Sequence, residues 1–328
     1  GRFQPLRVFD SRKELFEAGV IPEMQSGERY YDADRLWVGV VLSSFGICYN
    51  RDMLRVRGLE PPTRWRDLGD PGYARGIALA DTTKSSSVTK AFEMLVQEMI
   101  QREVAEADGA ERDAAVARGW TKGIQLIQRI GANARYFTDS SSKIPHDVAQ
   151  GNAVAGMCID FYGRTFNETL KKEDGSSRLE FVTPVGGSSI SVDPVAVLRG
   201  APHPDIAHGC VDFLLSKDAQ MIWNARLGEV PGPRYRALRR LPIRKDLYAG
   251  VTLEAMVDQD AMPYEAAREF HYDGDLTGHL VTPLRTIVRV MCIDSGEELK
   301  KAWAVLIEEG FPPEASAKFA DVSMVSYE

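Results

Sequence analysis

Residues 36–49, from Leu36 to Tyr49, have the sequence LWVGVVLSSFGICY and are followed by Asn50. The stretch is rich in β-branched and aromatic residues, and a run of this kind that ends in a turn-forming residue is typical of a β-strand. It is also shorter than the roughly 20 apolar residues that a membrane-spanning helix needs. We therefore expect a long strand over residues 36–49.

Strand-like and helix-like segments alternate after this stretch. Further strands are expected at residues 76–80, 135–138, 153–160, 181–184 and 188–198. Helices are expected after residues 85–87 and at residues 112–130, 146–150, 204–215, 218–227 and 297–309. The first of these helices carries Val88, Phe92, Leu95 and Met99 at helical intervals along one face. The alternation predicts an α/β fold with largely parallel sheets.

The composition is that of a globular protein, since 44% of the 328 residues are hydrophobic and 27% are charged. A chain of this length is long for one core, so we expect two lobes or domains. The formal net charge of −7 argues against nucleic-acid binding, which relies on a basic face. Residue 1 is glycine and no basic start leads into an apolar run, so we expect no direct membrane insertion and no signal peptide within this chain.

Common catalytic signatures are missing from the sequence. It contains no G-x-S-x-G, G-x-x-x-x-G-K-[ST] or H-E-x-x-H motif, and no G-x-G-x-x-G after a strand. The histidines share no metal-binding face, and the four cysteines have neither C-x-x-C nor zinc-site spacing. We predict that the protein is not an enzyme and that the cysteines are small buried side chains. Cys48 and Cys158 could form a disulfide if their strands are neighbours.

Three turns rich in hydroxyl groups are the strongest functional signal. Residues 82–87 (TTKSSS) lie between an expected strand and a helix, and residues 140–143 (SSSK) and 186–189 (GGSS) are similar. Such turns offer unpaired N–H groups, hydroxyl donors and the positive end of a helix dipole, which suit an anion. Each turn alone fits ordinary capping, but together they predict a polar ligand site. The expected ligand-binding residues there are Lys84, Ser85, Ser86, Ser87, Ser141 and Ser188.

Asp160, Phe161 and Tyr162 directly follow an apolar strand. Ligands of α/β proteins usually bind at the carboxyl ends of strands. There an aromatic ring can stack on a ligand, and a tyrosine can offer its phenol oxygen. We add these three residues to the ligand-binding set, with a structural aromatic cluster as the alternative.

Several segments, taken in order, resemble the periplasmic solute-binding proteins of ABC importers. The resemblance is to the ferric-iron type, which has the type II periplasmic-binding-protein fold. The segments are residues 37–50, 65–68, 85–87, 148–162, 201–207 and 213–220, and Pro231. Each motif is weak alone, but their order is specific, and the resemblance covers residues 1–233.

The resemblance implies two α/β lobes, each a mainly parallel sheet flanked by helices, joined by crossover strands. The crossovers would be residues 38–49 and 181–191. Lobe two would then span residues 46–185, and lobe one residues 1–45 together with 186–328. Hinges are expected near residues 43–46 and 186–189, and Ser43 and Ser44 join the ligand-binding set. Family members begin with a strand–helix–strand unit that has no match here, so lobe one would be incomplete at its N-terminus.

The resemblance leaves two kinds of ligand open. Ferric-iron members carry adjacent tyrosines where this chain has Phe161 and Tyr162. Fe³⁺ favours anionic oxygen ligands, and Phe161 supplies none. If the cargo is iron, its ligands would be Tyr162 and Asp160, whose side chains share one side of a regular strand. The competing cargo is a small organic or phosphorylated anion, with its charge at residues 85–87 and its body against Phe161 or Tyr162.

The expected function is that of the solute-binding component of an ABC transporter. The chain would capture its ligand in the cleft between the lobes, close around it by hinge bending and deliver it to a membrane permease. It would work in the periplasm or another extracytoplasmic space without a cofactor, and Fe³⁺ would enter only as cargo. The alternatives are an enzyme on the same fold, with Asp160 or Lys84 as acid or base, and a sensor or scaffold that lost its cleft.

Overall fold

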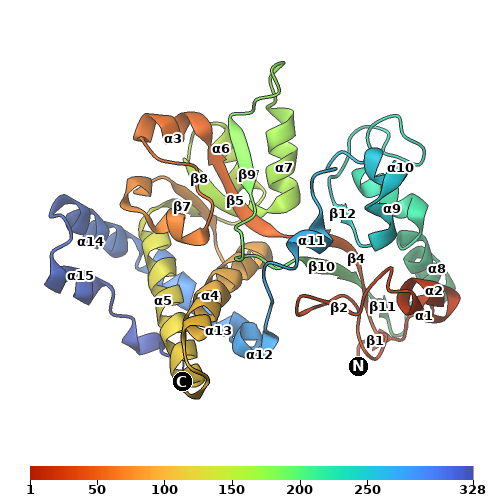
Figure 1. Ribbon diagram of the computed structural model, residues 1–328, viewed down its shortest axis with the longest axis horizontal. Coiled ribbons are helices and arrows are strands. Elements are labelled where there is room, and N and C mark those ends of the chain that lie inside the picture. The colour runs from red at the N-terminus through yellow and green to blue at the C-terminus, as the bar shows by residue number, and fades with distance from the viewer. Residues whose placement is uncertain (328) are drawn as a thin grey trace. The chain divides into compact units, whose positions relative to one another are not determined.

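The structure describes residues 1–327 and divides into two units, each with its own core. In this computed structural model, unit 1 consists of residues 1–44 and 189–272, and unit 2 consists of residues 45–188 and 273–327. The chain passes from one unit to the other after residues 44, 188 and 272 (Figure 1). The predicted α/β fold with two lobes is confirmed.

The strand predicted at residues 36–49 is two strands, one for each unit. β4 (Val38–Ser43) ends one residue before the unit boundary, and β5 (Phe45–Asn50) begins just after it. Asn50 then caps α3 (Arg51–Arg57), because its side chain accepts hydrogen bonds from the N–H groups of Asp52 and Met53. A single apolar run thus supplies a strand to both sheets.

Unit 2 is built on a mixed sheet with the strand order β7-β6-β8-β5-β9. Besides β5, its strands are β6 (Ile77–Ala80), β7 (Ala134–Thr138), β8 (Ala155–Ile159) and β9 (Leu179–Val182). β6 pairs in parallel with β7 and with β8, since helices connect these strands along the chain. β5 runs antiparallel to both β8 and β9. The sheet is therefore mixed rather than mainly parallel.

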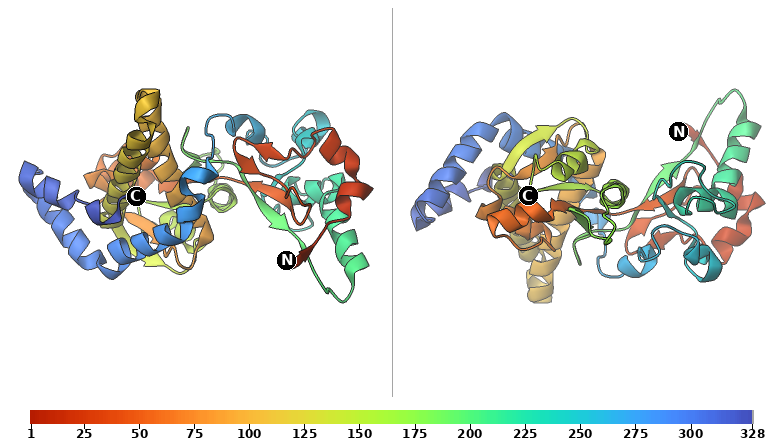
Figure 2. Two further views of the ribbon diagram at one scale, coloured as in Figure 1. Left: turned by 90° about the horizontal axis from the view of Figure 1, so that it is seen from below. Right: turned by 90° about the horizontal axis from the view of Figure 1, so that it is seen from above.

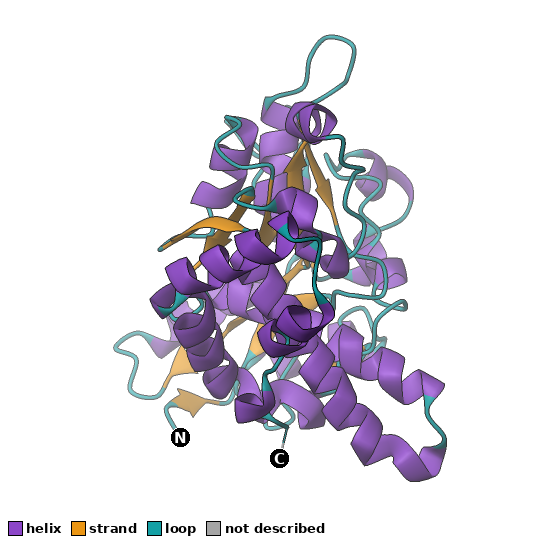
Figure 3. Cartoon of the chain, turned by 90° about the vertical axis from the view of Figure 1, so that its left-hand side faces the viewer, coloured by secondary structure: helices purple, strands orange, loops and turns teal. Residues whose placement is uncertain are grey.

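In unit 2, helices lie on both sides of the sheet (Figure 1 and Figure 3). Those before residue 188 in unit 2 are α3, α4 (Ser86–Glu106), α5 (Arg112–Ala132), α6 (Lys143–Ala149) and α7 (Asp160–Thr169). Two glycines let α4 and α5 approach closely. A Cβ atom on Gly119 would lie 2.4 Å from the Cα of Ile100, and one on Gly123 would lie 3.1 Å from the Cα of Val96. Any side chain at Gly119 would therefore push the two backbones apart.

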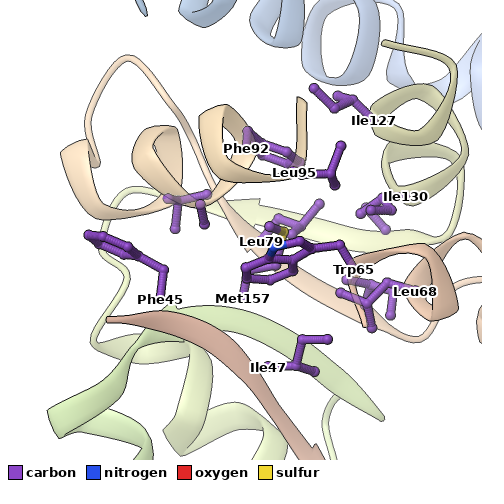
Figure 4. Packing of buried hydrophobic residues seen from close by; sticks show 14 of the residues in the cluster. Phe45, Ile47, Trp65, Leu68, Leu79, Phe92, Leu95, Ile127, Ile130 and Met157 are labelled. Atoms are coloured by element: carbon purple, nitrogen blue, oxygen red, sulfur yellow. The ribbon is translucent and has the colours of Figure 1, made fainter. Parts of the chain in front are cut away.

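An apolar core fills the space between the sheet and these two long helices. Figure 4 shows Phe92 and Leu95 of α4 and Ile127 of α5 beside the strand residues Leu79 and Met157. All five side chains are fully buried. Burying each one contributes roughly 1.5–3 kcal/mol, so this core accounts for much of the stability of unit 2.

Residues 273–327 pack on unit 2, which corrects the predicted extent of lobe one. They form α12 (Gly274–Thr277), α13 (Val281–Val288), a π-helical segment (Arg289–Asp294), α14 (Gly296–Glu308) and α15 (Pro313–Phe319). Figure 2 shows this blue segment beside α4 and α5 in both views. Leu284 and Val288 belong to the same core as α4, and the indole N–H of Trp303 donates to Asn133 at 2.8 Å. Lobe one therefore ends at residue 272.

Buried polar bonds join α4 to this C-terminal segment. The side chain of Gln97 is completely buried, and its Nε2 donates to the carbonyl of Asp273 and to Oγ1 of Thr277, each at 2.7 Å. Its Oε1 accepts from the N–H of Asp273 at 3.0 Å, and Thr277 Oγ1 donates to Glu93 at 2.7 Å. Buried polar groups need partners, so α4 specifies where the segment attaches.

Unit 1 contains only antiparallel pairings within the described part of the chain. The strands of its central sheet lie in the order β10 (Ser191–Val195), β4 and β12 (Leu241–Pro242). Two further sheets have two short strands each. One pairs β1 (Phe3–Gln4) with β11 (Val197–Leu198), and the other pairs β2 (Met24–Gln25) with β3 (Glu28–Arg29). β10 and β12 run in one direction but lie on opposite sides of β4. The prediction of a mainly parallel sheet is wrong for this unit, because β4 separates the two strands that could have paired in parallel.

The helices of unit 1 surround a second core. They are α1 (Val8–Ser11), α2 (Lys13–Glu17), α8 (Pro204–Leu214), α9 (Lys217–Asn224), α10 (Gly250–Glu254) and α11 (Pro263–Ala266). Val38 and Leu42 of β4 are fully buried in this core, together with Val211 of α8. The helices predicted at residues 204–215 and 218–227 correspond to α8 and α9.

Cys48 and Cys158 lie on neighbouring strands but are not opposite each other. Cys48 pairs with Gly156, and Gly46 pairs with Cys158, so the two cysteines are diagonal neighbours on one face. Diagonal positions are farther apart than opposite ones, and both residues are buried free thiols. Cys210 is exposed, so the prediction of burial is wrong for it.

Replacing Gln97 by Leu should destabilise the protein by about 2–3 kcal/mol, because the backbone groups of Asp273 and the hydroxyl of Thr277 would lose buried partners. Urea denaturation of the wild type and the variant measures this difference. Gln150→Leu, at an exposed position, is the control and should change the free energy of unfolding by less than about 0.5 kcal/mol. Equal effects of the two substitutions would contradict the role given to Gln97.

Candidate functional site

Three predicted site segments follow the carboxyl ends of parallel strands. Residues 81–87 follow β6, residues 139–142 follow β7, and residues 160–162 follow β8. Because β6 is parallel to both neighbours, these three segments leave the sheet at one edge. Ligands of open α/β sheets bind outside such an edge.

The first turn of α4 offers backbone donors without acceptors. Ser85 is the N-cap, and its hydroxyl accepts from the N–H of Val88 at 3.4 Å. The N–H groups of Ser86 and Ser87 have no acceptor within residues 1–327. Ser86 is exposed and Ser87 is half-buried, and the α4 dipole adds partial positive charge at this end. An anion at this position would satisfy both N–H groups.

Hydroxyl groups from two turns meet beside these donors. The hydroxyl of Ser87 donates to Ser141 Oγ at 3.1 Å and lies 3.2 Å from Ser85 Oγ. Ser141 belongs to the turn after β7, so the structure brings together residues more than 50 positions apart. These positions would allow the serines to contact one ligand, and that contact stays a prediction.

Lys84 is the cationic residue nearest in sequence to the start of α4, and it makes an exposed ion pair. Its Nζ lies 2.9 Å from Asp139, and the two side chains are 50% and 77% exposed. A pair this exposed contributes little to stability, so the lysine is free to exchange Asp139 for an anionic ligand. Asp81, by contrast, is buried and accepts from Thr83 and from Arg289 at 2.6 Å.

Asp160 does not lie on an extended strand as predicted. It is the first residue of α7 and is fully buried, with one oxygen accepting from the N–H of Phe161 at 2.7 Å and the other from Arg164 at 2.9 Å. Because residues in a helix turn by about 100° each, Asp160 and Tyr162 do not share one side. The carboxylate is therefore engaged by Arg164, a partner that the sequence analysis did not identify.

Phe161 and Tyr162 form a half-buried aromatic pair at the start of α7. Their ring centroids are 4.2 Å apart with an interplanar angle of 42°, and both rings pack against the core of unit 2. The structural role that the sequence analysis kept as an alternative is therefore real. The partial exposure of both rings still leaves surface for a ligand.

Ser43, Ser44 and Ser188 lie where the chain passes between the units. All three are buried, and the hydroxyl of Ser188 accepts from the N–H of Phe45 at 3.0 Å. Ser188 therefore helps to hold the start of β5 inside unit 2. Contact of these three serines with a ligand stays a prediction.

The C-terminal segment contacts the turn after β6 through Arg285 of α13 and Arg289 of the π-helical segment, and the sequence analysis missed both residues. The hydroxyl of Thr82 donates to the carbonyl of Arg285 at 3.1 Å, and Arg289 pairs with Asp81. They are about 200 positions from β6, and no local pattern marks them. Only the packing of α13 along α4 brings them to the turn.

Within residues 1–327, no group of three or more His, Cys, Asp or Glu side chains is arranged to hold a metal ion. Among the helices of residues 1–327, none combines the length and the apolar character that crossing a membrane requires.

Comparison with known proteins supports the resemblance found in the sequence. A family model described as bacterial extracellular solute-binding protein matches residues 8–249. The chain is similar to the phosphoglycerate transport regulatory protein PgtC of Salmonella typhimurium, with 28% identity over 195 residues. The match covers 59% of this chain and 42% of the relative, so the chain spans less than half the length of that protein.

Two solved structures share the fold. The periplasmic binding protein AfuA from Actinobacillus pleuropneumoniae, with fructose 6-phosphate bound, has a TM-score of 0.53 and 19% identity, covering 87% of this chain and 77% of that one. Iron-bound HitA from Pseudomonas aeruginosa has a TM-score of 0.53 and 17% identity, covering 89% and 76%. At these identities the likeness concerns the fold alone, and the fold is compatible with either predicted ligand.

Asp147 of α6 joins β7 to the start of α6 through its carboxylate. Its carboxylate accepts from Tyr136 and from Lys143, the latter at 2.6 Å, and lies 3.4 Å from His146. Burial opposes ionisation, but the hydrogen bonds from Lys143, Tyr136 and His146 outweigh it and lower the pKa of Asp147 below its ordinary value of 3.8. A lowered folded-state pKa contributes stability above the unfolded-state pKa, and this stability is lost as the pH falls through the folded-state pKa.

Asp147→Asn should therefore destabilise the protein most at neutral pH, and the difference from wild type should shrink below about pH 4. Urea denaturation at pH 7, 5 and 3.5 measures the difference. Asp139→Asn, which removes only an exposed pair, is the control and should have a small effect throughout. A difference between Asp147→Asn and wild type that stays constant with pH would contradict the assignment.

Proposed function

This chain belongs to the bacterial extracellular solute-binding protein family, and we propose on that premise that it captures a small phosphorylated or other organic anion for an ABC importer. It acts outside the cytoplasm as a receptor, binds its ligand stoichiometrically without turnover, and passes it to a membrane permease. No resident cofactor is needed for this role. These statements go beyond the family, because the chain spans less than half of the curated relative that it matches.

The observation that carries the proposal is the start of α4. Among residues 1–327 the N–H groups of Ser86 and Ser87 have no acceptor. The hydroxyl of Ser87 contacts those of Ser85 and Ser141, and Lys84 is close in sequence. Phosphate and carboxylate groups bind helix N-termini through such donors. The ligand that complements this surface is therefore an anion with several oxygen acceptors.

A phosphorylated compound fits the remaining observations best. A phosphate group offers three terminal oxygens, which is more than a single carboxylate can present to two N–H groups and several hydroxyls. Phe161 and Tyr162, at the same edge of the sheet, can contact the carbon part of such a ligand. PgtC is named as a phosphoglycerate transport regulatory protein, and the AfuA structure contains bound fructose 6-phosphate. Both compounds are phosphorylated, which supports the choice of this ligand class.

Ferric iron is the second candidate, and the similarity to HitA is the reason to keep it. The residues present are less suited to iron than to a phosphorylated anion. Asp160 is buried in an ion pair with Arg164, and Phe161 has no oxygen, so only Tyr162 of the three remains as a ligand. A hard trivalent ion favours several anionic oxygens, so a synergistic anion would have to supply most of them.

A sensory role is a further alternative, since the relative is described as a transport regulatory protein. In that case the same anion would bind, but the partner in the membrane would be a signalling protein. Co-purification with detergent-solubilised permease or with a signalling protein, in the presence of the bound ligand, separates the two roles.

Ser86→Pro should weaken binding of phosphorylated ligands about tenfold relative to Ser86→Ala. Proline suits the first position of a helix, and Ser85 before it is extended (φ −123°, ψ 106°), so the substitution removes one N–H group without disturbing α4. Ser86→Ala removes only the hydroxyl and is the matched control. Isothermal titration with fructose 6-phosphate and 3-phosphoglycerate measures the affinities.

Equal affinity of Ser86→Pro and Ser86→Ala would show that the start of α4 does not hold the anion. Failure of the wild type to bind any phosphorylated or carboxylated probe would overturn the proposed ligand class itself. Thermal melting of both variants confirms that α4 remains folded.

Native mass spectrometry and metal analysis of the purified protein test the iron alternative. The proposal predicts no stoichiometric iron and, where a ligand is retained, a small acidic organic compound. About one equivalent of iron, lost on Tyr162→Phe but retained in Tyr136→Phe, would establish the ferric alternative instead. Tyr136 is a suitable control because its hydroxyl is committed to Asp147.

A further inference from the structure

The connection between α9 and β12 is a loop whose two ends are joined. Residues 225–240, which we call the basic loop, belong to unit 1. Asn224 is completely buried, and its Nδ2 donates to the carbonyl of Arg240 at 3.2 Å, which brings the two ends of the loop together. Loops of up to about 16 residues with close ends are compact surface elements that frequently carry function.

Asp258 fixes the base of the basic loop. Its buried carboxylate accepts from Nδ2 of Asn224 at 2.9 Å and from Nε of Arg239 at 3.1 Å, and its N–H donates to Oδ1 of Asn224 at 3.0 Å. At the other end of the loop, the N–H of Arg226 donates to the carbonyl of Ala255 at 2.9 Å. A buried polar network whose members satisfy one another is rigid, so the exposed part of the loop rests on a fixed base.

The basic loop carries local positive charge in an acidic protein. It contains five arginines and one acidic residue, whereas the whole chain has a net charge of −7. Three of the arginines pair with carboxylates of unit 1. Arg234 and Arg236 are exposed, and neither makes an ion pair within residues 1–327. Two guanidinium groups that are two positions apart are therefore available to an anionic partner.

The same loop exposes large apolar side chains. Tyr235, which separates the two unpaired arginines in sequence, is 90% exposed, and Val230 is 95% exposed. Leu227 and Leu238 are 58% and 45% exposed. Single exposed apolar residues are common on protein surfaces, but four of them on one closed loop are typical of an interaction site.

We propose that the basic loop is a peripheral docking site for a membrane surface that contains anionic phospholipids. Arg234 and Arg236 would bind headgroup phosphates, and Tyr235 and Val230 would enter the interfacial region. The planar donors of arginine match phosphate oxygens, and tyrosine favours the boundary between lipid and water. The contact involves only loop side chains and no segment that crosses the bilayer. It goes beyond the proposed function and does not depend on the ligand bound at α4.

The exposure of the loop favours a lipid surface over an acidic protein as the partner. Side chains that are 90–95% exposed protrude from the surface, so a protein partner would need a matching depression that is lined with carboxylates. A bilayer surface adapts to protruding side chains and offers phosphates at many positions. The net charge of −7 opposes the approach to an anionic surface, but salt screens this repulsion beyond about 8–10 Å.

Arg234→Gln combined with Arg236→Gln should weaken membrane binding about 25-fold, since each basic residue near an anionic bilayer contributes a factor of roughly five. Co-sedimentation of the full chain at low salt measures the binding, with vesicles of equal parts phosphatidylglycerol and phosphatidylcholine. Arg12→Gln combined with Arg268→Gln is the matched control. It makes the same charge change at two exposed arginines of unit 1 outside the loop, and should leave the binding within about threefold.

Tyr235→Ser tests the apolar part of the contact without changing the charge. It should weaken binding to the same vesicles at least about threefold, because the ring no longer enters the interface. Met324→Ser, at a side chain of unit 2 that is 98% exposed, is the control and should have no effect. Thermal melting of all variants checks that these surface substitutions leave the protein folded.

Two results would overturn the proposal. One is equal binding of the wild type to the mixed vesicles and to vesicles of phosphatidylcholine alone, and the other is equal binding of the loop and control variants. Retention of the wild type on immobilised polyglutamate, lost with Arg234→Gln and Arg236→Gln and without any binding to vesicles, would assign the loop to an acidic protein partner instead. Titration with fructose 6-phosphate is unaffected by each of these outcomes, so the proposed function is tested separately.

Discussion

The parallel hydrogen bonds that join β6 to β7 on one side and to β8 on the other determine where the candidate site lies. Because the three strands run in the same direction, the turns that follow them emerge at one edge of the sheet, and α4, α6 and α7 all begin there. Unsatisfied N–H groups at helix starts therefore accumulate on one side of unit 2. The antiparallel strand β5 begins at the same edge, since Phe45 pairs with Ile159.

A second constraint is the attachment of residues 273–327 along α4. Gln97 and Glu93 hold α12, Thr82 holds α13 and Asp81 holds the π-helical segment, so the C-terminal segment follows α4 toward its first turn. These bonds are buried or half-buried and mutually dependent, so loss of one leaves others without partners. They place the carbonyl of Arg285 against Thr82, in the turn that contains the serines.

The charge distribution explains how an acidic protein could hold an anion. A net charge of −7 repels anions at long range, but this repulsion is screened over about 8–10 Å in physiological salt. Binding then depends on local donors, and most of those near the start of α4 are neutral N–H and hydroxyl groups. Neutral donors bind an anion through hydrogen bonds that point in fixed directions. They therefore discriminate between ligands by the number and direction of the ligand's oxygen atoms.

The sequence by itself determined the local elements: the strands and amphipathic helices follow from periodicity, and the serine-rich turn after β6 is a helix start in the structure as predicted. The order of motifs along the sequence also indicated the correct family. Only the tertiary structure decided that residues 36–49 divide at Ser44 into strands of two sheets, that Arg164 neutralises Asp160, and that α13 contacts the turn before α4. The reason is physical. Periodicity and capping act between residues a few positions apart, whereas strand partners and buried ion pairs depend on packing between distant segments, which leaves no local pattern.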